Sequence, residues 1–187
     1  MKRVSFLVLG VLIVLSTAMA ASANGKDPIV QGGTLEFQLS ELSGTLVSSA
    51  DPRFAGKVVL VDLWATWCPP CITEIPTLID LQEQYAERGL VIVGIAFEAE
   101  DQDDERRARL QQFVERQGIN YLVLDGGQPD NFETALPSVK NVRGFPVEIL
   151  IDRSGGIVAS RNGYGFKKKW ASRLRREIEE LLSESTD

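Results

Sequence analysis

Cys68 and Cys71 are the only two cysteines of the 187-residue chain, and two prolines separate them. Thiols at this spacing can alternate between a dithiol and a disulfide, so the pair indicates thiol–disulfide exchange. The pair stands between an apolar run and a helical pattern, which places Cys68 at the amino terminus of a helix. Unpaired N–H groups and a positive partial charge there favour the thiolate. Cys68 is therefore predicted to attack a partner's disulfide, and Cys71 to resolve the mixed disulfide.

Two other uses of the cysteines fit the sequence less well. A structural disulfide across two residues would close a very small loop and stabilise the fold little. Zinc needs four ligands, whereas the chain has two cysteines and no histidine. The lack of histidine also excludes Ser-His and Cys-His nucleophile pairs. The predicted chemistry therefore rests on the cysteines and on carboxylates, with no metal and no cofactor beyond the Cys68–Cys71 disulfide.

The spacing of apolar residues predicts the elements that position the pair. Residues 58–64 form a near-continuous apolar run, typical of a central strand covered on both faces. A helix with one apolar face follows the cysteines, kinked at Pro76 and closed by Gly89. Further strands are expected as a short hairpin or edge strand in 34–47 and at 90–97, 121–124, 147–151 and 157–160, with further helices ending at Gly118 and covering 170–181. This order predicts an α/β fold in which helices flank both faces of a mixed central sheet that carries an amino-terminal β extension.

The amino terminus has the layout of a secretory signal peptide. Lys2 and Arg3 precede the apolar run 4–15 and small-residue sites at 18–20 and 21–23. We interpret residues 1–23 as that signal, with an uncleaved membrane anchor as the alternative, 24–33 as a flexible lead-in and 34–187 as one domain. The domain would then work in the periplasm or another extracytoplasmic compartment, where disulfides persist. The net charge of −6 disfavours nucleic acid as a partner.

The motif around the cysteines resembles that of a known family. The stretch Val61–Cys71, the following Glu74-Ile75-Pro76 and the later Gly144-Phe145-Pro146 are similar to exported thioredoxin-like proteins of the TlpA/ResA type, which are associated with cytochrome c maturation. The likeness covers most of the chain after the signal and implies a thioredoxin fold. It also implies a reductase of protein disulfides, with apocytochrome c as the typical substrate. Its electrons would come from a membrane thiol carrier of the DsbD/CcdA type.

The residues predicted to contact the substrate are Trp67, Pro69, Pro70, Phe145 and Pro146. The resemblance implies that Pro146 follows a cis peptide bond and faces the cysteines, while Phe145 offers its backbone to a substrate strand. A proline that merely begins a strand is the alternative. Pro69 and Pro70 restrict the loop between the cysteines. Trp67 would present an apolar surface beside Cys68 or would pack against the protein, as Trp64 is expected to do.

Two carboxylates are candidates for moving protons. Asp62 lies inside the apolar strand, where burial would raise its pKa and make it a base for the proton of Cys71. It stands at the position of the buried acid of thioredoxin, where many exported relatives have Asn, and Glu74 matches the acid that those relatives use. Asp62 could instead be a buried acid satisfied by a neighbour, and Glu74 a solvent-facing residue of the first turns. Our hypothesis is that Asp62 is the main proton acceptor and that Glu74 takes the role otherwise.

The direction of electron flow is predicted from the loop between the cysteines. Cys-Pro-Pro-Cys lacks the histidine that strongly oxidising relatives place there, which favours a reductase. A disulfide oxidase or isomerase of broad range is the first alternative, and a thioredoxin-fold binding module without redox turnover is the second. Val147 stands where the family usually has Thr, which leaves the choice of partner open. The acidic stretch 98–105 is expected to be solvated surface.

Overall fold

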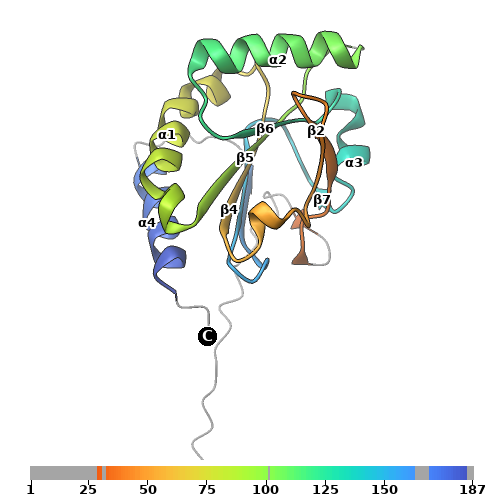
Figure 1. The fold of residues 1–187 in the computed structure, drawn as a ribbon. Helices are drawn as coiled ribbons and strands as arrows, with labels where there is room; N and C mark the ends of the chain where they lie inside the picture. Colours follow the sequence, from red (N-terminus) through yellow and green to blue (C-terminus); the bar gives the residue numbers. More distant parts are fainter. Residues whose placement is uncertain (1–28, 31–32, 101, 163–168, 185–187) are drawn as a thin grey trace, which may run out of the picture.

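A computed structural model describes residues 29–30, 33–100, 102–162 and 169–184 (Figure 1). The predicted signal peptide, 1–23, lies outside these residues. Within the described ranges, none of the helices combines the length and apolar character needed to cross a membrane.

A seven-stranded mixed sheet forms the centre of the molecule, in the order β3-β2-β6-β5-β4-β8-β9. Strand β4 (Val58–Trp64) pairs in parallel with β5 (Leu90–Ala96) and antiparallel with β8 (Val147–Ile151). The other strands are β2 (Gln38–Glu41), β3 (Leu46–Ser48), β6 (Leu122–Asp125) and β9 (Ile157–Asn162), with β3 and β9 at the edges. All seven residues of β4 are buried. The near-continuous apolar run therefore forms a strand that is covered on both faces, as predicted.

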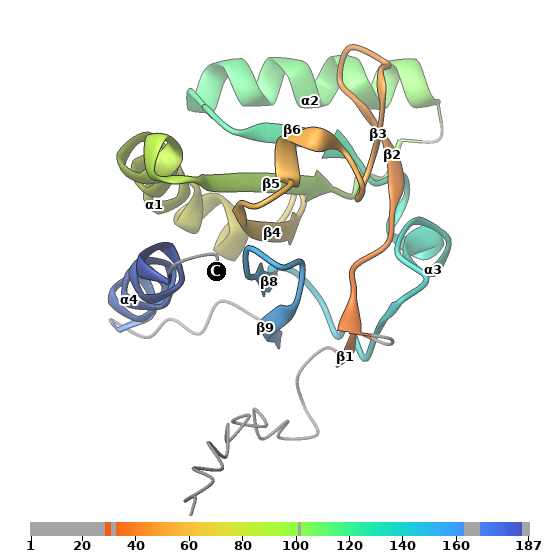
Figure 2. The same cartoon turned by 60° about the horizontal axis from the view of Figure 1, so that its bottom comes forward.

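Helices cover both faces of this sheet. Helix α1 (Pro69–Tyr85) and helix α4 (Trp170–Ser183) lie side by side on one face, and the short α3 (Phe132–Ala135) lies on the other (Figure 2). Helix α2 (Asp103–Gln117) adds Leu110 and Phe113 to the core beneath α1 and α4. Short 3₁₀ segments lie at Pro52–Phe54, Ala86–Arg88 and Pro129–Asn131.

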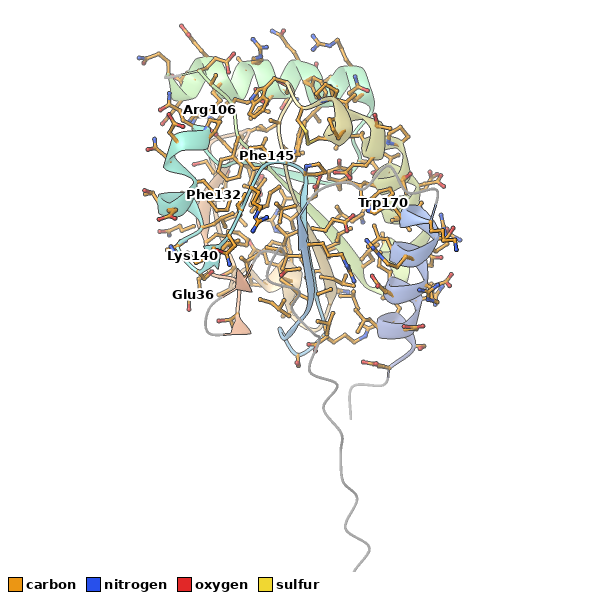
Figure 3. The ribbon with its side chains drawn as sticks, turned by 180° about the vertical axis from the view of Figure 1, so that it is seen from behind. Glu36, Arg106, Phe132, Lys140, Phe145 and Trp170 are labelled. Atoms are coloured by element: carbon orange, nitrogen blue, oxygen red, sulfur yellow. A yellow bond between two sulfur atoms is a disulfide. The ribbon has the colours of Figure 1, made fainter. Side chains whose placement is uncertain are left out.

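The alternation of side chains along β4 divides the core in two. Leu60 and Trp64 pack with α1, α2 and α4, whereas Val59, Val61 and Leu63 pack with α3 and the segment before β2. Figure 3 shows this division, with Trp170 on one side of the sheet and Phe132 on the other. Because successive residues of a strand face opposite sides, Asp62 shares the α1 side with Leu60 and Trp64. The only charged residue of β4 is thus directed beneath the helix that carries Cys71.

The predicted thioredoxin-like α/β fold is confirmed, and the differences are local. The expected hairpin within 34–47 is formed by β2 and β3 and extends to Ser48. Helix α1 includes Pro76, and Gly89 has a left-handed conformation at the end of the 3₁₀ turn that follows the helix. The lead-in 24–33 was expected to hold little structure, but it contributes β1 (Ile29–Val30), which pairs with β7 (Val139–Lys140). This two-residue pairing depends on a partner 110 residues later in the chain, which local sequence patterns do not show.

Candidate active site

The two cysteines lie where β4 ends and α1 begins, and a disulfide joins them with their Cα atoms 5.3 Å apart. Cys68 is the N-cap of α1, and Pro69 and Pro70 occupy its first two positions. Because proline has no N–H, the first free backbone donor of the helix belongs to Cys71. That N–H donates to Sγ of Cys68 over 3.3 Å. In the reduced protein, the same donor would stabilise a thiolate on Cys68.

The two cysteines differ in their access to solvent. Cys68 is 5% exposed and Cys71 is fully buried. A partner's disulfide can therefore be reached by Cys68 alone, because the side chain of Cys71, in the first turn of α1, is buried. This difference supports the predicted order of events, in which Cys68 attacks and Cys71 resolves.

Aromatic side chains form the surroundings of Cys68. Trp67 is 51% exposed, and its indole N–H donates to the backbone oxygen of Phe97 over 3.2 Å. Its ring meets Phe145 edge-on at 5.9 Å, and Phe145 stacks on Phe97 at 5.3 Å. Trp67 is thus fixed at one edge while much of its ring stays open to solvent. Trp64, by contrast, is fully buried and packs on Phe113, as expected of a core residue.

The loop before β8 contains the predicted proline. The Phe145–Pro146 peptide bond is cis, as the resemblance implies. Phe145 is half-buried against Trp67, whereas Pro146 itself is buried. Pro69, which directly follows Cys68, is exposed and Pro70 is half-buried, so apolar residues flank Cys68 on both sides in the sequence. These apolar residues are the part of the site that a partner protein could cover.

Glu98 is a site residue that the sequence analysis missed. It lies two residues after the end of β5 and is 1% exposed, and its carboxylate accepts from both the backbone N–H (2.6 Å) and the hydroxyl (2.8 Å) of Thr66. Burial raises the pKa of Glu98, and the two donors of Thr66 oppose that rise. The expectation of a solvated acidic stretch over 98–105 is therefore wrong at Glu98, and its last residues begin α2. Glu98 holds the chain two residues before Cys68.

Replacing Glu98 with glutamine is expected to destabilise the protein by about 1–3 kcal/mol, because an amide cannot accept from both donors of Thr66 without turning an N–H toward one of them. Disulfide exchange should also slow, since the segment that leads into Cys68 loses an anchor. Urea unfolding and the initial rate of insulin reduction measure the two effects. Glu100→Gln is the matched control, because Glu100 is more exposed and pairs with Arg109. Equal effects of the two substitutions would contradict the anchoring role.

The two predicted carboxylates, Asp62 on β4 and Glu74 on α1, are both buried. Asp62 is 2% exposed and Glu74 is 1% exposed, so Glu74 does not face solvent. Oδ1 of Asp62 and both carboxylate oxygens of Glu74 find no N–H or O–H donor among the described residues. The two carboxyl groups lie close enough to hydrogen-bond each other, which requires that one of them be protonated. The pair can therefore hold a proton next to the helix turn that carries Cys71.

Electrostatics favour the protonated form of this pair. Burial is the main cause that raises the pKa of Asp62, and the charge of Glu148 raises it further. Burial also raises the pKa of Glu74 most, followed by the charges of Asp62 and Glu148. Two like charges in a low-dielectric site oppose full ionisation. A base of this kind can accept a proton near neutral pH.

Glu148 is a second buried acid that the sequence analysis missed. It lies on β8, is 6% exposed, and is the direct cross-strand neighbour of Asp62. The indole N–H of Trp170 donates to its carboxylate. Burial raises the pKa of Glu148, while Trp170, Arg173 and Arg161 lower it. The signal in the sequence was a single acid inside the apolar run 147–151, the same signal that identified Asp62.

The chain is similar in sequence and in fold to known redox proteins. The sequence profile of the Redoxin family matches residues 28–172. The thioredoxin-like protein YneN of Bacillus subtilis strain 168 is 29% identical over 139 residues, which cover 74% of this chain and 75% of YneN. The thiol-disulfide oxidoreductase ResA of the same strain is 27% identical over 164 residues, 84% of each chain. A thioredoxin-family thiol:disulfide interchange protein from Chlorobium tepidum TLS has a crystal structure that matches with a TM-score of 0.64 at 27% identity, over 81% of this chain and 96% of that one.

Proposed function

The chain belongs to the Redoxin family and is a thiol–disulfide oxidoreductase of the ResA type, and from this premise we propose that it reduces disulfides of partner proteins outside the cytoplasm. The main observation in support of the proposal is the arrangement of Cys68 and Cys71. The attacking Cys68 caps α1, and the resolving Cys71 is buried about one helix turn before Glu74, which is coupled to Asp62.

The reaction proceeds in two exchanges, each of which forms one S–S bond and breaks another. The Cys68 thiolate attacks one sulfur of the partner's disulfide, and the other partner sulfur leaves as a thiolate that takes a proton from water. The thiol of Cys71 then loses its proton to the carboxylate of the Asp62–Glu74 pair and attacks Sγ of Cys68. The partner's second sulfur leaves, so two electrons have passed to the partner. The protein ends with the Cys68–Cys71 disulfide that the structure contains.

The start of α1 supports reduction over oxidation. A thiolate that is strongly stabilised makes the dithiol form the stable one and the disulfide a strong oxidant. Pro69 and Pro70 remove two of the backbone donors that a helix amino terminus would otherwise direct at Cys68. The buried acids, in turn, disfavour a second negative charge on Cys71. Both features leave the dithiol form less stable and so favour electron donation.

The reduction potential of the Cys68–Cys71 pair tests the direction. We expect a value close to about −270 mV, the range of thioredoxin, when the purified domain is equilibrated with dithiothreitol buffers. Separation of the alkylated reduced protein from the disulfide form measures the ratio at each buffer. A value near −120 mV would show an oxidase and would overturn the proposed direction.

The proposed substrate class is a protein with a disulfide in an extended, accessible segment, with the paired haem-binding cysteines of apocytochrome c as the example. The apolar surface around Trp67 and Phe145 suits such a segment, and the half-buried Phe145 comes just before the cis bond. A membrane thiol carrier of the DsbD/CcdA type would reduce Cys68–Cys71 again. Competition between an oxidised apocytochrome peptide and oxidised insulin would test this choice. A preference for insulin would point to a broader range.

The proposed location outside the cytoplasm rests on residues 1–23, as a signal peptide or an uncleaved anchor. Fractionation of cells that express the full chain, followed by amino-terminal sequencing, separates the two. Recovery of an intact Met1 terminus in the cytoplasm would contradict both.

A further inference from the structure

A row of charged side chains crosses the sheet beneath α1 and α4. Glu148 on β8 pairs directly with Asp62 on β4 and, on its other side, with Arg161 on β9. Directly opposed residues of antiparallel strands project to the same face, so these three side chains lie on the α1 and α4 side of the sheet. The row begins at Asp62, which is 2% exposed, and ends at Arg161, whose side chain is 24% exposed. It therefore connects the buried acid pair to the edge of the sheet.

Helix α4 supplies the groups that favour a negative charge on Glu148. The indole N–H of Trp170 donates to Oε1 of Glu148, and a guanidinium nitrogen of Arg173 lies 3.7 Å from Oε2. Arg161 pairs at 2.8 Å with Glu177, which belongs to the same helix. A donor and two cations thus face Glu148 from α4 and β9. Figure 3 shows Trp170 on the α4 side of the strands.

The acid pair itself has no such support. Glu148 faces it from β8, and Tyr121 faces it from the segment before β6, where burial and the charges of Asp62 and Glu74 raise the pKa of the phenol. No ion pair joins a described Lys or Arg to Asp62 or Glu74. The described residues also contain no cluster of acids, cysteines and histidines that could hold a metal ion. Within the described residues, the charged group next to the pair is therefore an acid, with its own cations on the far side.

We propose that Glu148 is a positioning residue for proton transfer, whose negative charge acts through Asp62 and Glu74 and strengthens their hold on a proton. The inference rests on the proposed function, because the proton in question is the one that Cys71 releases when it attacks Sγ of Cys68. With Glu148 ionised, one carboxyl of the pair keeps its proton and the other accepts the proton of Cys71 near neutral pH. Without that charge, the pair becomes a weaker base and ionises at lower pH.

The test replaces Glu148 with glutamine, which keeps an oxygen for the indole N–H of Trp170 and removes the charge. Carboxyl ¹³C NMR of the reduced full-length protein follows the titration of Asp62 directly. We expect its midpoint to move to lower pH by about one unit or more, the effect of one charge at cross-strand distance. The acidic limb of the rate profile for insulin reduction should move in the same direction.

Two matched variants separate charge from packing. Glu177→Gln removes the α4 acid that pairs with Arg161 and should leave the Asp62 midpoint within a few tenths of a unit. Glu148→Asp keeps the charge and should keep most of the wild-type midpoint. An equal shift in Glu148→Gln and Glu177→Gln, or no shift in either, would overturn the proposal. If Glu148→Gln does not fold, the titration of Glu148 in the wild-type protein tests the proposal, because a Glu148 that is protonated at neutral pH would also overturn the proposal. Failure of the wild-type protein to reduce insulin would sink the proposed function, while the NMR titration would still report on Glu148.

Discussion

Replacing Cys68 with serine is expected to abolish disulfide exchange, with a loss of more than about a thousand-fold in the rate of insulin reduction. The structure explains the size of the effect. Cys71 is fully buried and cannot take over the attack, and a serine hydroxyl at the N-cap of α1 would keep the helix capped without providing a nucleophile. Turbidity of reduced insulin and far-UV circular dichroism measure activity and folding separately.

Cys71→Ser is the matched variant for the same experiment. It keeps the attacking thiol and removes the resolving one, so a mixed disulfide with the partner should accumulate. Mass spectrometry after a single turnover detects that adduct, which Cys68→Ser cannot form. Adducts on Cys71 in the Cys68→Ser protein would contradict the assigned order of attack.

Replacing Asp62 with asparagine is expected to slow disulfide reduction at neutral pH by about 100-fold, the usual contribution of a positioned base. The pair would lose one carboxyl and with it the ability to accept the proton of Cys71. Glu74→Gln should have the smaller effect if Asp62 is the main acceptor. The pH profile of the single-turnover rate distinguishes them, because the variant that lacks the acceptor loses its acidic limb. An unchanged profile in Asp62→Asn would transfer the role to Glu74.

The same variant should gain stability at alkaline pH. Burial raises the pKa of Asp62 in the folded protein, so the folded state binds more protons than the unfolded one once the pH exceeds about 4, the unfolded value. The free energy of unfolding therefore falls as the pH rises above that value. Asparagine removes the buried charge, so the variant should exceed wild type by on the order of 2–4 kcal/mol at pH 9 and converge with it near pH 4. Urea unfolding at the two pH values measures the difference, and parallel curves would contradict it.

Local patterns were sufficient to predict the central part of the fold. The apolar run 58–64 became β4 with the same bounds, because a strand covered on both faces needs no alternation. The helix after the cysteines and its closure at Gly89 were also predictable, since capping depends on neighbouring residues. The pairing of β1 with β7 and the short α3 were not, because they depend on partners far along the chain.

The sequence indicated the two cysteines of the candidate site but only some of its buried acids. Asp62 was recognised because it interrupts an apolar run, and Glu148 gave the same signal one strand later. The strand register that places Glu148 opposite Asp62 cannot be read from local patterns, because the two residues are 86 positions apart in the chain. Glu98 was misread for a related reason. An acid at the end of a strand is solvated or buried according to what the neighbouring loop offers, and here Thr66 offers two donors.

The pairing of β4 has a consequence for the order in which the molecule assembles. β4 pairs on one side with β8, which is distant in the sequence. The pairing of Val59 with Ile151 therefore needs most of the chain to be present. Contacts of such long sequence separation form late, because a large loop must close first. Until then, β4 lacks one of its two neighbours, and the core cluster that contains Cys71 lacks Leu150 of β8. The complete burial of Cys71, which distinguishes it from Cys68, therefore depends on a strand that lies about 80 residues later in the chain.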